Sequence, residues 1–261
     1  MEQKEKLTTL EQGLKILQLF NEEVPSHTIS SVSKIHNISR STARRYLLTF
    51  AGEGYLKFDG KNFFLSSKVL DFAYNFLSIN NISTIVAPYL KELTESTNEP
   101  SGLATLDGSD IKYLGWNNYN SVWKFRRNLE IGARLPAFCT SMGRVLLSFL
   151  TEHELQQFKK EFKPHSFTKY TKTSLDSLNK NINFVRKNGY SVMNQELIIG
   201  ISTVAVPIYD NKGSSFLALN IAVEHGKYDD EAIRKKIVPK MAKIAARISE
   251  DIKLYSNSVG M

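Results

Sequence analysis

The strongest constraint on the fold is a pair of helical patterns separated by a very short turn. The first runs from Ser30 to His36 and ends at Asn37, a residue type that tolerates the left-handed backbone found at helix ends. The second begins at Ser39, whose hydroxyl suits an N-cap. Its apolar stripe consists of Ala43, Tyr46, Leu47 and Phe50. Because a further helical pattern, Leu10–Phe20, precedes both, the sequence predicts three short helices in a row.

Two short β-prone runs follow these helices. They are Tyr55–Phe58 and Asn62–Leu65, and they are joined through Asp59-Gly60, a dipeptide favoured in tight turns. Three helices followed by a hairpin are the element order of a winged helix-turn-helix. In that arrangement the helix that begins at Ser39 takes the recognition position, and the hairpin is the wing.

The charge distribution over this region favours a polyanionic partner. The chain has 34 Lys and Arg against 26 Asp and Glu, a formal charge of +8, and no acidic residue lies between Glu23 and Glu53. Arginine grips guanine bidentately, and hydroxyl and free N–H groups at a helix start bind phosphate. We therefore expect double-stranded operator DNA to contact Ser39, Arg40, Ser41, Thr42, Arg44, Arg45 and, from the wing, Lys57 and Lys61. The alternative is a basic, serine-rich helix that is only a solvated surface, but the order of the elements favours DNA binding.

The rest of the chain predicts a linker and a second, mixed domain. Val69–Leu77 has the apolar pattern of a connecting helix. The expected strands beyond it are Ser101–Leu106, Ile111–Trp116, Ile201–Tyr209 and Phe216–Val223. The expected helices are Thr84–Thr97, Ser141–Leu150, one capped by the Thr151/Glu154 pair, Leu175–Asn188 and Asp229–Tyr255. Pro207 lies inside an expected strand and indicates a sheet edge or a bulge.

We accordingly expect an α+β protein with three parts. These are a winged helix-turn-helix at residues 1–67, a linker helix at 68–80 and an α/β domain built around one sheet at 81–261.

The chain gives no sign of a metal site or a catalytic centre. Cys139 is the only cysteine, which excludes an intramolecular disulfide framework and a thiol cluster for zinc. The five histidines are scattered, and phosphate-loop and Gly-x-Ser-x-Gly motifs are absent from the sequence. We expect no metal, no cofactor and no enzymatic activity. Because the start lacks a signal peptide and no run approaches the roughly 18 to 20 apolar residues of a membrane span, we expect a cytoplasmic protein without a membrane partner.

Several segments together resemble the IclR family of bacterial regulators. They are Ser39–Leu48, Gly54–Leu56, Gly132–Pro136, Thr140–Leu147 and Gly200–Pro207, and the resemblance extends from about Thr8 to Ile252. The segments STARRYL and RLPA…TSMGRVLL are most similar to the branch that controls catabolism of protocatechuate and 4-hydroxybenzoate. The resemblance implies a winged-helix homodimer or dimer of dimers, with a GAF-like C-terminal domain that binds a small organic acid.

The resemblance also implies where the acid binds. The family's pocket lies between the segment with Ser141 and Met142 and the later strands, where its polar positions correspond to Met193, Thr203, Asn220 and Ala222. Family members that bind small keto acids have an acidic residue at the position of Met193 and a hydroxyl at that of Ala222. This chain departs from both. A thioether in place of a carboxylate suits a larger, partly apolar ligand such as an aromatic acid.

Three further features have two interpretations each. Arg134 is expected to pair with the ligand carboxylate, or to brace a loop or an interface. Trp116, with Trp123 and Phe125, supplies aromatic contacts to the ligand, or packs in the core or a dimer interface. Cys139 is a redox sensor, or a small buried apolar residue. For the C-terminal domain as a whole, the alternative to an effector sensor is a module for dimerisation or for a protein partner.

Overall fold

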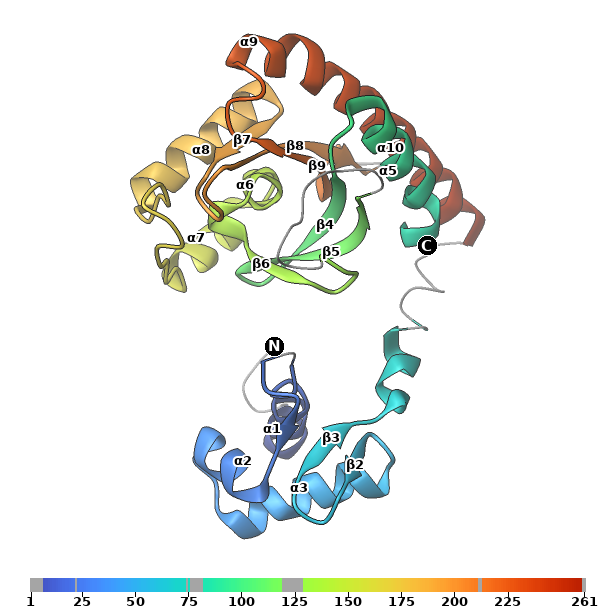
Figure 1. Cartoon of the computed structure of the whole chain (residues 1–261), viewed down its shortest axis with the longest axis vertical. Helices are drawn as coiled ribbons and strands as arrows, with labels where there is room; N and C mark the ends of the chain where they lie inside the picture. Colours follow the sequence, from blue (N-terminus) through green and yellow to red (C-terminus); the bar gives the residue numbers. More distant parts are fainter. Residues whose placement is uncertain are drawn as a thin grey trace. The chain divides into compact units, whose positions relative to one another are not determined.

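The computed structural model describes residues 7–21, 23–73, 75, 82–118, 129–210 and 213–259. The chain divides into two compact units, Met1–Asn80 and Asn81–Met261 (Figure 1). The second unit begins at the residue where the sequence places the second domain.

The first unit has the predicted element order, with one short strand added. It contains α1 (Thr8–Leu17), β1 (Ser26–His27), α2 (Ile29–His36), α3 (Arg40–Gly52), β2 (Leu56–Phe58) and β3 (Phe63–Leu65). The strands form an antiparallel sheet in the order β1-β3-β2, so the predicted hairpin is confirmed. β1 was not predicted, because two residues carry no periodicity and pair only through β3.

Local capping fixes the ends of α2 and α3. Thr28 and Ser31 form a reciprocal capping box at the start of α2, and Asn37 ends it in the predicted left-handed conformation, with φ of 51°. Ser39 accepts a hydrogen bond of 3.1 Å from the N–H of Thr42, as an N-cap should. The helices and the sheet share one core of Ile16, Phe20, Val32, Ala43, Leu47, Leu56 and Phe63.

Only part of the predicted linker helix lies within the described residues. A single 3-10 turn, η2 (Ser67–Val69), leads into helical residues 70–73. Positions 74 and 76–81 lie outside the described residues.

The second unit is built on a six-stranded antiparallel sheet in the order β6-β5-β4-β9-β8-β7. The strands are β4 (Ser101–Asp107), β5 (Asp110–Asn117), β6 (Arg134–Pro136), β7 (Ser191–Asn194), β8 (Ile201–Tyr209) and β9 (Ser215–Glu224). The helices are α5 (Ile82–Thr97), α6 (Ser141–Ser148), α7 (Glu152–Lys160), α8 (Leu175–Asn188), α9 (Asp230–Ala232) and α10 (Val238–Val259). A 3-10 turn, η3 (Ala137–Cys139), precedes α6, and a π turn, η4 (Ile233–Ile237), precedes α10.

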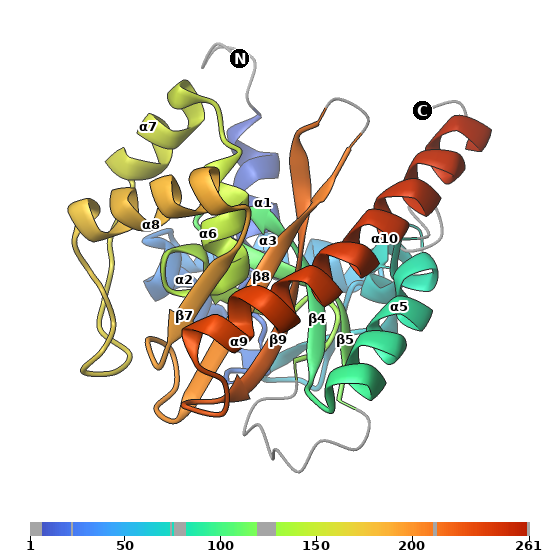
Figure 2. The same cartoon turned by 90° about the horizontal axis from the view of Figure 1, so that it is seen from above.

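Helices cover both faces of this sheet. α5 and α10 lie on one face, and α6 and α8 lie on the other (Figures 1 and 2). Alternation along β9 divides its side chains between the faces: Leu217, Leu219, Ile221 and Val223 join the core under α5 and α10. Ala218 joins the core under α6 and α8. Asn220 and Ala222, in step with Ala218, therefore face α6.

The departures from the predicted elements are short strands and a divided helix. β6 and β7 were missed, since each has four residues or fewer, too few to show a periodic pattern. The predicted Asp229–Tyr255 helix consists of α9, η4 and α10. Pro207 was correctly assigned to an open edge, because β7 pairs only with residues 202–205 of β8, and a register shift follows at Ile208. Within the described residues, no helix has the length and apolar character needed to cross a membrane.

Candidate functional site

One face of α3 is an exposed, polar and basic surface. Ala43 and Leu47 are buried, which leaves Ser39, Arg40, Ser41, Arg44 and Arg45 exposed and Thr42 half-buried. The hydroxyls of Ser41 and Thr42 each lie 2.8 Å from that of Ser39, so three hydroxyls gather at the helix start. The predicted DNA-contacting residues of α3 thus share one solvent-facing surface.

The cations of this surface have no protein partner in the described part of the chain. No ion pair is formed there by the three arginines of α3 or by the two exposed lysines of the wing. These residues are Arg40, Arg44, Arg45, Lys57 and Lys61. The wing turn is held by Asp59, which accepts hydrogen bonds of 2.8 and 2.7 Å from the N–H groups of Lys61 and Asn62. These bonds lower the pKa of the Asp59 carboxyl, Asn62 contributing most. Lys61 is therefore presented from a fixed turn, and Lys57 from strand β2, where it pairs with Phe64.

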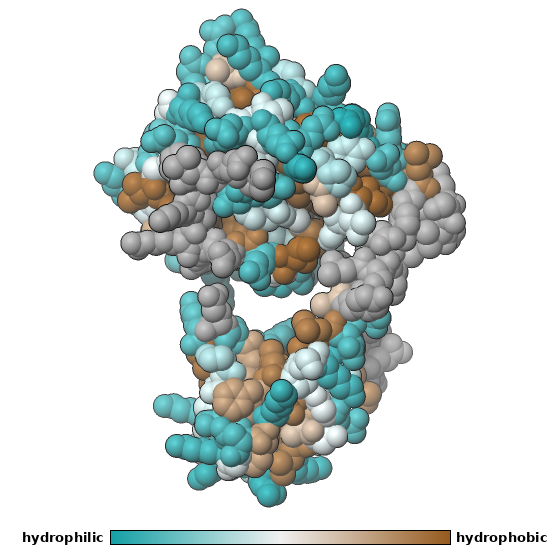
Figure 3. All heavy atoms as spheres, turned by 45° about the vertical axis from the view of Figure 1, so that its right-hand side comes forward, coloured by the Kyte–Doolittle hydropathy of each residue, from teal (hydrophilic) through white to brown (hydrophobic). Residues whose placement is uncertain are grey.

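Apolar side chains also gather on the surface of the first unit (Figure 3). Those exposed on and beside α1 are Leu7, Leu10 and Leu14. Leu10 and Leu14 are four residues apart and therefore share one face of α1.

The second unit contains a cavity of about 170 Å³ between the sheet and α6. Its walls are Tyr113, Trp116, Leu129, Leu135, Thr140, Ser141, Met142, Phe167, Met193, Leu197, Ile198, Ile201, Thr203, Asn220 and Ala222. None of these side chains belongs to Asp, Glu, Lys, Arg or His, so the described lining is apolar with a few hydroxyls and one amide.

Strand register builds the floor of this cavity. Met193, Thr203 and Ala222 are successive partners across β7, β8 and β9. Asn220 and Trp116 each pair with Gly102 from opposite sides. A Cβ on Gly102 would lie 2.9 Å from atoms of both side chains, so glycine there makes room for them. The strands thereby bring together residues up to about a hundred positions apart.

The start of α6 closes the cavity from the other side. Thr140 caps the helix by accepting a 3.1 Å bond from the N–H of Gly143, and its carbonyl accepts from the N–H of Arg144. The N–H groups of Ser141 and Met142 are left without an acceptor in the described residues. A Cβ on Gly143 would collide with the backbone of Ala137, so α6 packs against η3 at the closest possible distance.

Two polar side chains in the cavity have unused hydrogen-bonding capacity. Asn220 is 3% exposed, and its Oδ1 has no partner. The neighbouring hydroxyl of Tyr113 has its pKa raised by burial, against an opposing hydrogen bond from Asn220, so it remains protonated and able to donate. Thr203 donates a 2.7 Å bond to the Ser141 hydroxyl.

The cavity contains seven of the eight residues that the sequence assigned to ligand binding. They are Trp116, Ser141, Met142, Met193, Thr203, Asn220 and Ala222. Trp123 and Phe125 lie outside the described residues.

Arg134 is the exception, and its expected pairing with a ligand carboxylate needs correction. It lies on the edge strand β6, does not line the cavity, and is 46% exposed. Its guanidinium bonds Asp107 at 2.5 Å and Asp110 at 3.2 Å. The register of β5 and β6 places it beside these two carboxylates, so it braces the β4–β5 turn.

Sequence reasoning missed several walls of the cavity. Phe167, Leu197 and Ile198 come from loops, where no periodicity marks a binding residue. Tyr113 lies on a predicted strand, but it is three residues from Trp116, so simple alternation would put the two on opposite faces. The register shift between Leu103 and Ala104 brings both to the cavity side.

Comparison with known proteins gives two matching family models. Residues 9–60 match the model described as "IclR helix-turn-helix domain". Residues 74–250 match that described as "Bacterial transcriptional regulator IclR C-terminal".

Individual relatives cover nearly the whole chain. The Pca regulon regulatory protein of Pseudomonas putida is 33% identical over 233 residues, 89% of this chain and 80% of that protein. The p-hydroxybenzoate hydroxylase transcriptional activator of Acinetobacter baylyi is 27% identical, over 90% of this chain and 88% of its own. The crystal structure of an IclR homolog from Microbacterium hydrocarbonoxydans, complexed with 4-hydroxybenzoate, has a TM-score of 0.76 at 19% identity, covering 94% of this chain and 98% of its own. This last likeness shows the shared fold.

Proposed function

The chain belongs to the IclR family of DNA-binding transcriptional regulators, and from that premise we propose that its cavity senses a monocyclic aromatic acid such as 4-hydroxybenzoate or protocatechuate. The observation that carries the proposal is the uncharged cavity of the second unit. It is closed by the N-terminus of α6, whose first N–H groups have no acceptor in the described residues.

The size and walls of the cavity suit one aromatic ring. Its volume is about 170 Å³, and an engineered apolar cavity of about 150 Å³ is large enough to hold benzene. Met193, Leu135 and Trp116 offer apolar and aromatic contacts to a ring. The absence of a carboxylate at Met193 removes the charge that would repel the acid.

Polar groups are present for both ends of such a ligand. The unused N–H groups of Ser141 and Met142, with the helix dipole of α6, suit its carboxylate. The unpartnered Oδ1 of Asn220 and the Tyr113 hydroxyl suit a ring hydroxyl. Recognition of the acid would therefore use neutral donors and not an arginine, which agrees with the position of Arg134 on the outer edge of the sheet.

For the DNA side, we propose that Ser39, Arg40, Ser41, Thr42, Arg44 and Arg45 contact an operator from α3, with Lys57 and Lys61 on its backbone. We further propose that Leu7, Leu10 and Leu14 pack against a second copy of the chain, in a homodimer or a dimer of dimers. We also propose that it acts in the cytoplasm, where a DNA-binding regulator of this family finds its operator. We propose further that it has no catalytic activity, which the uncharged lining of the cavity supports.

The test is fluorescence anisotropy with DNA from upstream of the protein's own gene, at two salt concentrations, with and without each acid. We expect specific binding whose affinity changes with one of the acids, and a loss of affinity at higher salt. Specific binding that ignores both acids would contradict the proposed effector class. Binding that is equal on unrelated DNA would contradict the choice of operator.

A further inference from the structure

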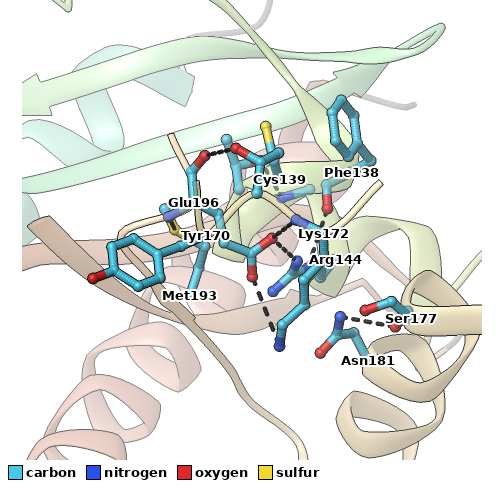
Figure 4. A network of polar contacts seen from close by, with 12 residues as sticks. Phe138, Cys139, Arg144, Tyr170, Lys172, Ser177, Asn181, Met193 and Glu196 are labelled. Carbon is cyan, nitrogen blue, oxygen red and sulfur yellow. Dashed lines mark hydrogen bonds and ion pairs between the residues drawn. The ribbon is translucent and has the colours of Figure 1, made fainter. Parts of the chain in front are cut away.

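Glu196 is the junction of three segments that wall the cavity. Its Oε2 lies 2.7 Å from Nη2 of Arg144 on α6 and accepts a 3.1 Å bond from the N–H of Lys172, in the loop between α7 and α8 (Figure 4). Glu196 itself lies in the loop between β7 and β8. Arg144 and Glu196 are 52 residues apart in sequence.

The ion pair is almost completely dehydrated. Arg144 is 1% exposed and Glu196 is 2% exposed. The Nε of Arg144 also donates to the carbonyl of Phe138 at 3.2 Å, in the turn before α6. Neither side chain lines the cavity.

The two loops joined at Glu196 form part of the cavity rim. Ile198 lines the cavity and is 40% exposed, and Phe167 in the α7–α8 loop lines it and is 36% exposed. Ile199, beside Ile198, is 63% exposed. Leu197 packs against the core, whereas the exposed surface of Ile198 and Ile199 stays in water, so polar contacts carry part of the attachment of these loops.

Hydroxyl groups supply the remaining attachment. Thr168 donates a 2.7 Å bond to the carbonyl of Gln195, and Thr171 donates a 2.6 Å bond to that of Glu196. The N–H of Glu196 in turn contacts Sδ of Met193 at 3.2 Å. The position of Glu196 thus sets both the rim of the cavity and the thioether in its floor.

We propose that Arg144, Glu196, Thr168 and Thr171 form a clasp that holds the β7–β8 and α7–α8 loops closed over the cavity. These are positioning residues, which control how readily a ligand enters and leaves without touching it. The clasp is a property of the ligand-free chain, and only its effect on aromatic acids depends on the proposed function.

The test is amide hydrogen exchange, read by mass spectrometry on the full chain without ligand. Thr171→Val removes the hydroxyl bond to the carbonyl of Glu196, together with the two bonds that this hydroxyl accepts from the N–H groups of Phe167 and Thr168. Thr171→Ser keeps a hydroxyl for all three. Thr105→Val is the matched control, because it removes a 3.0 Å hydroxyl bond to a carbonyl, that of Phe216, elsewhere on the sheet. We expect about fivefold faster exchange over residues 194–201 in Thr171→Val, and wild-type exchange in Thr171→Ser and Thr105→Val. Equal exchange in Thr171→Val and wild type, or an equal rise in Thr105→Val, would overturn the clasp.

A second arm uses 4-hydroxybenzoate as the calorimetric probe. Thr171→Val should raise its dissociation constant about fivefold and leave DNA affinity without the acid unchanged. If the wild-type chain does not take up this acid, the aromatic-acid proposal fails, and the exchange arm still decides whether the clasp exists.

Discussion

Thr203 Oγ1 donates a hydrogen bond of 2.7 Å to Ser141 Oγ, and so joins β8 to the first residue of α6 inside the cavity. Because the oxygen of Ser141 accepts this bond, its own proton is directed elsewhere and is free to donate. The Thr203 hydroxyl therefore orients the Ser141 hydroxyl toward a ligand.

Removing the Ser141 hydroxyl should weaken effector binding. We expect Ser141→Ala to raise the dissociation constant of 4-hydroxybenzoate about tenfold, since a hydrogen bond to a charged group contributes about 1.5 to 3 kcal/mol. Titration calorimetry checks this, with Ser148→Ala as the control, because Ser148 is a buried serine at the far end of the same helix. An unchanged constant for Ser141→Ala would exclude its hydroxyl from recognition.

Replacing Arg44 should weaken specific DNA binding without unfolding the first unit. Arg44 is exposed and has no ion-pair partner in the described part of the chain, so its guanidinium is available for a base edge. We expect Arg44→Ala to cost about 1 to 3 kcal/mol of specific binding free energy, measured by anisotropy. Arg234→Ala, which removes an exposed arginine from the second unit, is the matched control and should bind like wild type. A normal affinity for Arg44→Ala would remove this residue from the interface.

Met193 should determine the class of acid that the cavity accepts. It is 2% exposed, so a carboxylate at this position would be dehydrated and would repel an anionic ligand. We expect Met193→Asp to lower affinity for 4-hydroxybenzoate more than about tenfold, by at least about 1.4 kcal/mol, whereas Met193→Leu stays within about threefold. If both variants bind equally well, the charge at this position is irrelevant to specificity.

Cys139 should make the protein less stable at alkaline pH. Burial raises the pKa of its thiol from 9.0 to about 12. Above pH 9 the unfolded chain loses this proton while the folded chain keeps it, so the free energy of unfolding falls as pH rises. Between pH 9 and pH 10 we expect wild type to lose about 1 kcal/mol more than Cys139→Ala, in urea unfolding. Parallel losses in the two proteins would mean that the folded thiol ionises normally. The same burial opposes a redox-sensing role.

Removing one partner of the Arg144–Glu196 pair should destabilise the protein strongly, whereas replacing both partners with apolar residues should destabilise it much less. Glu196→Gln leaves a buried guanidinium without its counter-charge, which we expect to cost about 3 to 5 kcal/mol in urea unfolding. The double variant with Arg144→Met and Glu196→Met should recover more than half of that loss. A single variant as stable as wild type would indicate that water reaches the pair.

Local signals made most of the fold predictable. The caps at Asn37, Ser39 and Thr151 and the apolar stripe of α3 lie within a few residues of the helices that they define. Strands β1, β6 and β7 lack such signals, because each has only two to four residues, too few to show alternation. The helices and the long strands were therefore easier to predict than the short strands at the edges of the sheets.

The candidate site divides in the same way. The floor residues Thr203, Asn220 and Ala222 lie on predicted strands, and the family resemblance placed them correctly in the cavity. The rim depends on loop conformation, for example the positive φ of 57° at Gln195. No sequence pattern predicts such a conformation at a glutamine. For Arg134 the sequence left two interpretations, and the β5–β6 register supports the brace, because it gives the guanidinium Asp107 and Asp110 as partners.

The close approach of Gly143 to Ala137 predicts the phenotype of a mutation at this position. Any side chain there would displace the start of α6 from η3 and so deform the wall that carries Ser141 and Met142. The core of the first unit draws none of its members from that region, since its buried residues run from Ile16 to Phe63. An allele encoding alanine at this position should therefore produce a regulator that still occupies its operator but no longer responds to its effector.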